Sequence, residues 1–175
     1  MLYDNGQLAS LYADVFERTG DAYYARVLAD LLDYVLNEMT DSDTGVFFSA
    51  QDAEVNTHEG ENYLWSPEQV RSVLSERGLT ADLPFALEYF GLDKGANFQD
   101  PHHRELPPSN VLFLAERPDA FALRKKISQD EFDQALVRVR DAMYQARQLR
   151  DQPGLDDKVI TSWNGLMIKG LADGG

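Results

Sequence analysis

Apolar residues recur at helical spacing along the first forty residues, and this pattern constrains the fold more than any other feature of the sequence. Positions three and four residues apart lie on one face of a helix, and a first apolar stripe has this spacing at Leu8, Leu11, Tyr12, Val15 and Phe16. We expect Asp4 or Asn5 to cap this helix. A second stripe follows the break at residues 19–21, at Tyr24, Val27, Leu28, Leu31, Leu32, Val35 and Met39. Two amphipathic helices joined by a short turn predict an antiparallel helical hairpin whose apolar stripes are buried.

The apolar runs become shorter and less regularly spaced between residues 40 and 114. Pro, Gly, Asn and Asp cluster in turns, and brief apolar runs between them are typical of short strands. Ser66 and Gln69 form a capping box with a proline at the first helical position, which marks the start of a helix. The expected elements are a turn at 41–45, a hairpin of strands 46–48 and 63–65 around a long acidic loop, helices at 67–78 and 81–90, a loop at 92–108 and a strand at 110–114.

Two further helices are expected in the last third of the chain. Ser128 and Glu131 form a second capping box, which opens a helix of about twenty residues. Residues 151–157 have loop composition, and a last helix follows over residues 162–171. Its apolar side chains have no later segment to pack on, and the first helix begins almost at Met1, so we expect a chain cut at both ends. Helical hairpins alternating with long loops predict a mainly α fold with a small β-hairpin, part of an α/α toroid.

Composition and charge exclude several classes of function. The chain has 30 acidic and 16 basic side chains and a net charge of −14, which repels nucleic-acid phosphates. It has no cysteine, so disulfides, thiolate metal sites and cysteine nucleophiles are excluded. No apolar run approaches the roughly 18 residues of a membrane span, and the first residues lack the pattern of a signal peptide. We therefore expect a cytoplasmic protein that binds neither nucleic acid nor membrane.

The segment of residues 49–65 is the first candidate site. It has four carboxylates, no basic side chain and two aromatic residues near its end. Crowded carboxylates raise each other's pKa values, and a pair of them can divide into acid and base at a glycosidic bond, while aromatic faces stack on sugars. A solvated acidic loop explains the same composition. The candidates are Asp52 as a catalytic residue and Glu54, Glu61, Tyr63 and Trp65 as substrate-binding residues.

Metal binding is the weaker interpretation of the acidic and histidine residues. Asp52, Glu54, Glu59 and Glu61, with His58, match no familiar spacing of metal ligands. Residues 41–45 resemble the start of a calcium loop but lack its later acidic ligands, and the adjacent His102 and His103 are expected to point apart in a loop. We therefore expect no metal site and no cofactor.

Residues 155–165 form the second candidate site, where acidic, basic, aromatic and amide side chains follow one another closely. Asp156 or Asp157 is a candidate general acid or base, with Lys158 tuning its pKa. Trp163 and Asn164 are candidates to stack on a substrate and to hold its hydroxyl group. In the structural alternative, an aspartate pairs with Lys158, Thr161 caps the last helix and Trp163 is part of the core.

Five segments together resemble the spermatogenesis-associated protein 20 family, whose members contain a thioredoxin-like domain. The segments that carry the resemblance are residues 1–8, 48–53 with 59–65, 95–98, 110–112, and 155–158 with 164–168. The resemblance implies a thioredoxin-like domain, absent from this chain, followed by a six-hairpin toroid like those of glycosidases and of N-acylglucosamine 2-epimerase. Residues 1–175 would then be part of one toroid domain. Glu54 and Val55 stand where the family commonly has Asp and Ser, which keeps the acid and loses the hydroxyl group.

Two hypotheses about function follow. In the first, an acidic central pocket of the toroid binds a carbohydrate and catalyses either epimerisation or glycoside hydrolysis. In the alternative, the toroid is a non-catalytic binding and scaffold module that serves the thioredoxin-like domain. The expected partners are accordingly a carbohydrate ligand and the remainder of the parent protein. The family carries no firmly assigned reaction, so the resemblance informs the fold more than the function.

Overall fold

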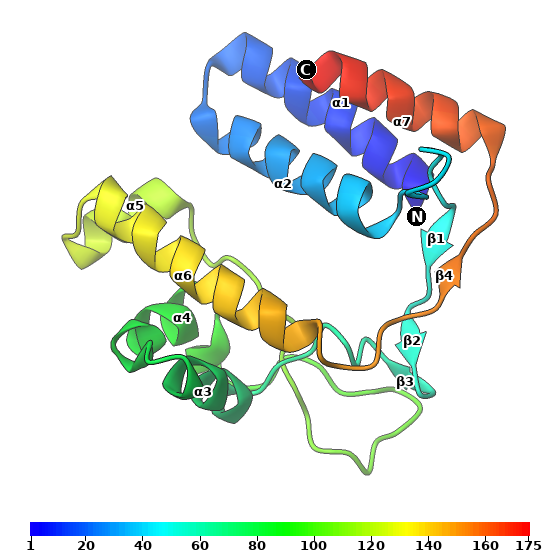
Figure 1. Ribbon diagram of the computed structural model, residues 1–175. Coiled ribbons are helices and arrows are strands. Elements are labelled where there is room, and N and C mark those ends of the chain that lie inside the picture. Colours follow the sequence, from blue (N-terminus) through cyan, green and yellow to red (C-terminus); the bar gives the residue numbers. More distant parts are fainter. The chain divides into compact units, whose positions relative to one another are not determined.

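The computed structural model describes all residues, 1–175, and is mainly helical, as expected (Figure 1). The helices are α1 (Leu2–Thr19), α2 (Ala22–Glu38), α3 (Pro67–Glu76), α4 (Leu83–Tyr89), α5 (Pro118–Lys125), α6 (Gln129–Arg147) and α7 (Thr161–Gly174). Two single 3-10 turns lie at Thr80–Asp82 and Leu92–Lys94, and the strands are β1 (Ala50–Gln51), β2 (Glu54–Val55), β3 (His58–Glu59) and β4 (Leu155–Asp156). None of the helices has the length and apolar character that a membrane-spanning segment needs.

The chain divides into two compact units. The first unit consists of residues 1–52 and 153–175, and the second unit consists of residues 53–152. Each unit has its own sheet of two antiparallel strands: β1 pairs with β4 in the first, and β2 pairs with β3 in the second.

The first unit is a bundle of α1, α2 and α7, in which α7 lies along α1 (Figure 1). Small residues make this close approach possible. A Cβ atom placed on Gly6 would lie 2.7 Å from the carbonyl carbon of Leu166, and one placed on Gly170 would lie 2.7 Å from the carbonyl oxygen of Gly6. The two helices therefore meet backbone to backbone, and the core beside this contact contains Leu2, Ala9, Ala13, Leu28, Val35, Met39, Phe47 and Met167.

The face that α1 buries differs from the expected stripe. Leu8, Leu11 and Phe16 are 40%, 52% and 40% exposed. The buried face is instead Leu2, Gly6, Ala9 and Ala13. Both sets have helical spacing, and the set with small side chains is buried because only small side chains let α7 come so close. The helix also begins earlier than expected, at Leu2, with Met1 as its N-cap and no side-chain cap from Asp4 or Asn5.

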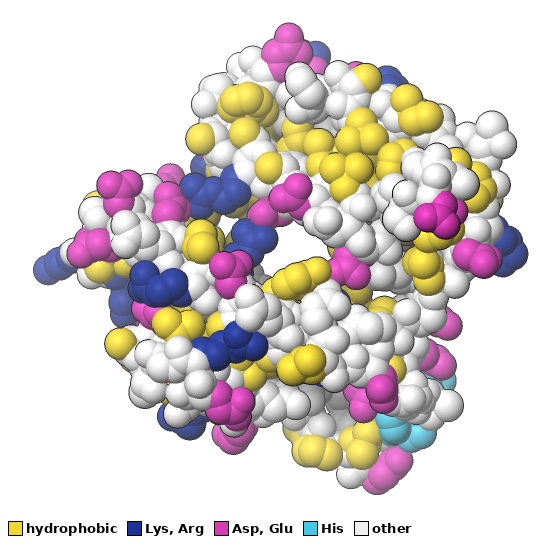
Figure 2. Space-filling model, in the orientation of Figure 1, with side chains coloured by type: hydrophobic (Ala, Val, Ile, Leu, Met, Phe, Trp, Pro, Cys, Tyr) yellow, Lys and Arg dark blue, Asp and Glu magenta, His cyan; other side chains and the backbone are white.

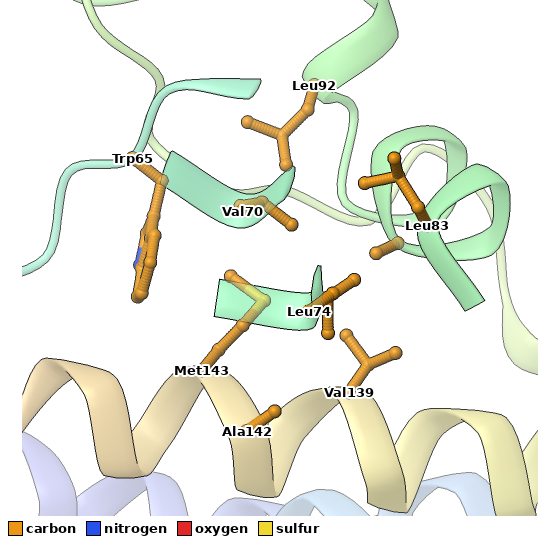
Figure 3. Packing of buried hydrophobic residues seen from close by; sticks show 9 residues of the cluster. Trp65, Val70, Leu74, Leu83, Leu92, Val139, Ala142 and Met143 are labelled. Carbon is orange, nitrogen blue, oxygen red and sulfur yellow. The ribbon is translucent and has the colours of Figure 1, made fainter. Parts of the chain in front are cut away.

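The second unit packs α3 and α4 against α6 (Figure 3). Figure 3 shows Val70 and Leu74 of α3 facing Val139, Ala142 and Met143 of α6, with Trp65 beside them. Both predicted capping boxes are confirmed, at Ser66 for α3 and at Ser128 for α6. A second cluster of aromatic rings joins α4, α5 and α6, in which Phe85 and Tyr89 make edge-on contacts with Phe121 and Phe132.

The hairpin expected from the sequence is corrected, and so is the strand expected at 110–114, which forms only a single bridge at Asn110. Segments 46–48 and 63–65 are not paired strands: Phe47 forms a single bridge with Thr40, and Trp65 forms one with Asn110. Phe47 and Trp65 instead enter the cores of separate units. Helix α5 was not predicted, because its eight residues are too few to show a clear helical period.

Acid is expected to loosen the attachment of α5 to α4 in the second unit. Glu88 accepts hydrogen bonds from Lys125 (2.7 Å) and Arg124 (2.6 Å), which lower the pKa of its carboxyl group. A group whose pKa is lower in the folded state stabilises the fold above its unfolded pKa, and this stabilisation is lost as the pH falls through the folded pKa. Because the pairs are near the surface, we expect a loss of about 1 kcal/mol or less below pH ~4. Urea unfolding of Glu88→Gln should lack this part of the acid dependence; an unchanged dependence would contradict the assignment.

Candidate functional site

The residues predicted to form a site fall in both units. The first unit contains Asp52, Asp156, Asp157, Lys158, Trp163 and Asn164, and the second contains Glu54, Glu61, Tyr63 and Trp65.

In the first unit, the β1–β4 pairing brings the two distant segments of the sequence side by side. Ala50 pairs with Asp156, and the backbone amide and hydroxyl groups of Ser49 both donate to the carbonyl oxygen of Asp156, at 3.1 Å. The ladder continues at Asp52, whose amide donates to the carbonyl oxygen of Gly154 at 2.7 Å. The structure thus brings Asp52 and the strand that carries Asp156 to the same small sheet.

Asp156 is paired with Lys158 and is not poised to donate a proton. The Lys158 ammonium group lies 2.9 and 3.0 Å from the two carboxylate oxygens. This hydrogen bond from Lys158 lowers the pKa of the Asp156 carboxyl group. A general acid at neutral pH needs a raised pKa, so Asp156 has the opposite property. The neighbouring Asp157 is exposed, as is Asp52.

The side-chain amide group of Asn164 is hydrogen-bonded to the backbone of two other residues. Its Oδ1 accepts from the amide of Phe47 at 3.0 Å, and its Nδ2 donates to the carbonyl oxygens of Phe47 at 2.9 Å and of Ile160 at 3.3 Å. Trp163 lies edge-on to Tyr3 with a centroid distance of 4.8 Å and packs against the core. The predicted cap is corrected, because Ile160 is the N-cap of α7 and Thr161 makes no capping bond. The side chain of Asn164 instead donates to the carbonyl oxygen of Ile160 in the first turn of the helix.

In the second unit, Trp65 is 3% exposed and has no free face for a sugar. The Arg150 guanidinium group lies 3.9 Å from the ring centroid. Its Nη1 donates to the carbonyl oxygens of Asn62 at 2.9 Å and of Leu64 at 2.7 Å. Burial, followed by repulsion from Arg147, lowers the pKa of Arg150, but an arginine remains charged at neutral pH.

Tyr63 is the one predicted platform that is accessible, although it too has a cationic neighbour. It is 43% exposed, and the Arg147 guanidinium group lies 4.8 Å from its ring centroid. Arg147 also donates to Oδ1 of the buried Asn62 at 2.9 Å, and the Asn62 Nδ2 donates to the carbonyl oxygen of Asp151 at 2.8 Å. Glu54 and Glu61 are exposed. Arg147 and Arg150 could not be recognised from the sequence, because two arginines at and just after the end of an amphipathic helix form no motif.

One group in the second unit has the composition of a metal site. One nitrogen each of His58 and His103 and one carboxylate oxygen of Asp100 lie within 4.8 Å of one another, and no other set of three or more potential ligands is so close. Of the residues weighed as metal ligands from the sequence, His58 and His103 belong to this group, whereas Asp100 was not among them. The turn at Asp41 is confirmed as a turn, since its Oδ1 accepts from the amides of Asp43 and Thr44.

Asp100 is held as a carboxylate within its loop. It is 7% exposed, and burial by itself favours a higher pKa, but amide groups of His102, His103 and Glu59 donate to it and the net effect is a lowered pKa. The hydrogen bond that His103 makes to the Glu105 carboxylate raises the pKa of the His103 imidazole.

Comparison with known proteins shows where these segments recur. The chain is 33% identical to human spermatogenesis-associated protein 20 over 98% of its length and 32% identical to the mouse protein over the same share. It is 30% identical to an uncharacterized protein of Caenorhabditis elegans, again over 98% of its length. No protein-family profile matches the chain.

The chain spans 23% of the length of the human and mouse proteins and 25% of the length of the nematode protein. The resemblance inferred from the five segments is confirmed: over its whole length, the chain is homologous to a segment of the spermatogenesis-associated protein 20 family.

Proposed function

We propose that this chain is a non-catalytic part of a larger α/α toroid, and that it acts as a binding and scaffold module of its parent protein. The observation that carries the proposal is the use of Asn164, whose amide group binds both backbone polar groups of Phe47. An asparagine with its oxygen and nitrogen bound to the backbone has little capacity left for a substrate hydroxyl group. Trp65 is likewise not available to stack on a sugar, because its ring is buried beneath the guanidinium group of Arg150.

The exposed apolar stripe of α1 supports the toroid and the scaffold role together. Leu8, Leu11 and Phe16 are at least 40% exposed although they have the spacing of a buried face. In a toroid, each helical hairpin packs against its neighbours, and the rest of a protein about four times as long as this chain would supply such neighbours. We infer that other segments of the parent protein cover this stripe, and that the parent's thioredoxin-like domain, implied by the family resemblance, is what the scaffold serves.

Replacing Asn164 by alanine tests the observation directly. The substitution leaves the amide and carbonyl groups of Phe47 without their partner, and Phe47 is 6% exposed. We expect a loss of about 1–3 kcal/mol in the free energy of unfolding. Denaturation of the purified chain, followed by circular dichroism, measures this loss. Ser162→Ala on the exposed side of the same turn is the matched control. Equal stabilities of the two variants would contradict a structural role for Asn164.

The competing function, sugar epimerisation or glycoside hydrolysis, rests on the exposed carboxylates Asp52 and Asp157. A thermal-shift screen of sugars and sugar phosphates against the full-length parent separates the two proposals, since a ligand that binds the native state raises its melting temperature. We expect no sugar to shift the transition. A shift with one sugar that disappears in Asp52→Asn or Asp157→Asn, with the melting of the unliganded variants unchanged, would overturn the scaffold proposal and establish a carbohydrate site.

A further inference from the structure

We propose that His58, Asp100 and His103 bind one divalent transition-metal ion of the zinc class. The group joins two segments of the second unit: His58 begins β3, and the other two residues belong to the loop of residues 97–110. Figure 2 shows histidine side chains gathered at the surface beside acidic ones. Two imidazoles and one carboxylate are a donor set that suits Zn²⁺ and its neighbours, with the remaining position open to water.

An unsatisfied ring nitrogen of His58 faces the carboxylate of Asp100. Nδ1 of His58 is buried and has no hydrogen-bond partner. It lies 3.8 Å from Oδ2 of Asp100, too far for a hydrogen bond. Ligands bound to one tetrahedral zinc ion at 2.0–2.1 Å are about 3.3 Å apart, so a movement of about half an ångström would bring both atoms to ligand distance. A metal ion between them would satisfy the nitrogen and balance the buried negative charge.

The groups around the three ligands are already arranged to orient them. Metal-bound histidines normally use their second ring nitrogen to hold an acceptor. The two ring nitrogens of His103 lie 3.2 Å from the Glu105 carboxylate and 3.2 Å from the Thr57 carbonyl oxygen. Whichever nitrogen turns to the metal, the other keeps an acceptor. The rings of His58 and His103 lie 4.3 Å apart, and Asp100 is fixed by backbone amides.

The turn before His58 has an unusual backbone conformation. Asn56 and Thr57, which connect β2 to β3, have φ angles of 53° and 68°. A β-branched residue such as threonine rarely adopts a positive φ, so the conformation of Thr57 is strained. The tight turn lies directly before His58 and presents the Thr57 carbonyl oxygen to His103. A bound metal ion would offset the strain by tying the β2–β3 hairpin to the loop of residues 97–110.

The chain contains three histidines, which allows a test with an internal control. His102 is exposed, and its ring is not part of the group. Titration of the full chain with Zn²⁺, followed by NMR of the imidazole protons, should shift the signals of His58 and His103 with saturation at one ion per chain. The His102 signals should stay in place. Equal shifts of all three rings, or no saturation at one equivalent, would overturn the proposal.

Calorimetry on variants makes the test quantitative. His58→Ala and His103→Ala should each weaken Zn²⁺ binding by about tenfold or more, while His102→Ala should bind as the wild type does. Asp100→Asn retains an oxygen that can accept from the backbone amides and should lose affinity with the loop still folded, as checked by circular dichroism of the metal-free variants. The titrations contain excess Mg²⁺, because the 30 acidic side chains can hold cations without a defined site. Affinity that disappears in Mg²⁺, or that is the same in all variants, would contradict the site.

Discussion

Replacing Gly170 by alanine is expected to destabilise the three-helix bundle of the first unit, because the added methyl group has no room between α7 and α1. The added Cβ would lie 2.7 Å from the carbonyl oxygen of Gly6 and 2.8 Å from Cβ of Ala9. Neither atom is the end of a flexible side chain, so α7 must move away from α1. Overpacking of this kind costs roughly 1–3 kcal/mol. Gly6→Ala should have a similar effect, since its Cβ would meet the backbone of Leu166 and Met167 at 2.7–2.8 Å.

Gly165 offers a control in the same helix. A Cβ atom at Gly165 meets nothing within 4 Å, and alanine is favoured over glycine inside a helix by about 0.5–1 kcal/mol. Gly165→Ala should therefore raise the stability of the bundle while Gly170→Ala lowers it. The chain has two tryptophans, and Trp163 belongs to the first unit. Its fluorescence in a Trp65→Phe background reports the unfolding of this unit. Changes of the same sign in both variants would show that helix propensity, and not the contact of α1 with α7, decides the outcome.

This contact also explains why the sequence predicted the helices better than their packing. The helical spacing of apolar residues was sufficient to locate α1 and α2. In α1, however, the expected face and the buried face have the same helical period, so the period does not distinguish them. The buried face could not be chosen from hydrophobicity, which favours Leu8 and Leu11 over Gly6 and Ala9. The choice depends on how closely α7 approaches, and α7 lies about 160 residues away in the sequence. Capping boxes at Ser66 and Ser128 were predicted correctly because their signal is local.

In the candidate site, too, contacts between neighbours in the sequence could be predicted, and contacts between distant residues could not. The residue types at 155–165 pointed to chemistry, and one local pair, Asp156 with Lys158, was foreseen in the structural alternative. The bond of Asn164 to Phe47 was not, because it joins residues 117 positions apart. His58 and Asp100 likewise come together only through the fold. Side chains that carry chemistry can be listed from a sequence, whereas their partners depend on packing.

Arg150 is expected to be the most sensitive charged residue of the second unit. Its guanidinium group covers the buried ring of Trp65 at 3.9 Å and donates to the carbonyl oxygens of Asn62 and Leu64. Replacing it by alanine removes the stacking and leaves two carbonyl oxygens without this donor. We expect a loss of about 2–4 kcal/mol in the free energy of unfolding. Urea denaturation followed by Trp65 fluorescence, in a Trp163→Phe background, measures it.

Two further variants distinguish the shape of the guanidinium group from its charge. Arg150→Lys keeps the positive charge but has neither the planar surface that stacks on Trp65 nor the fixed geometry of the donors, so it should recover less than half of the lost stability. Arg77→Ala removes an exposed arginine, bonded to Gln145, from the same unit and should change the stability by no more than about 0.5 kcal/mol. Full recovery by lysine would show that charge alone is sufficient. In that event any cation at this position would cover Trp65 equally well, and its burial alone would close the ring to a sugar.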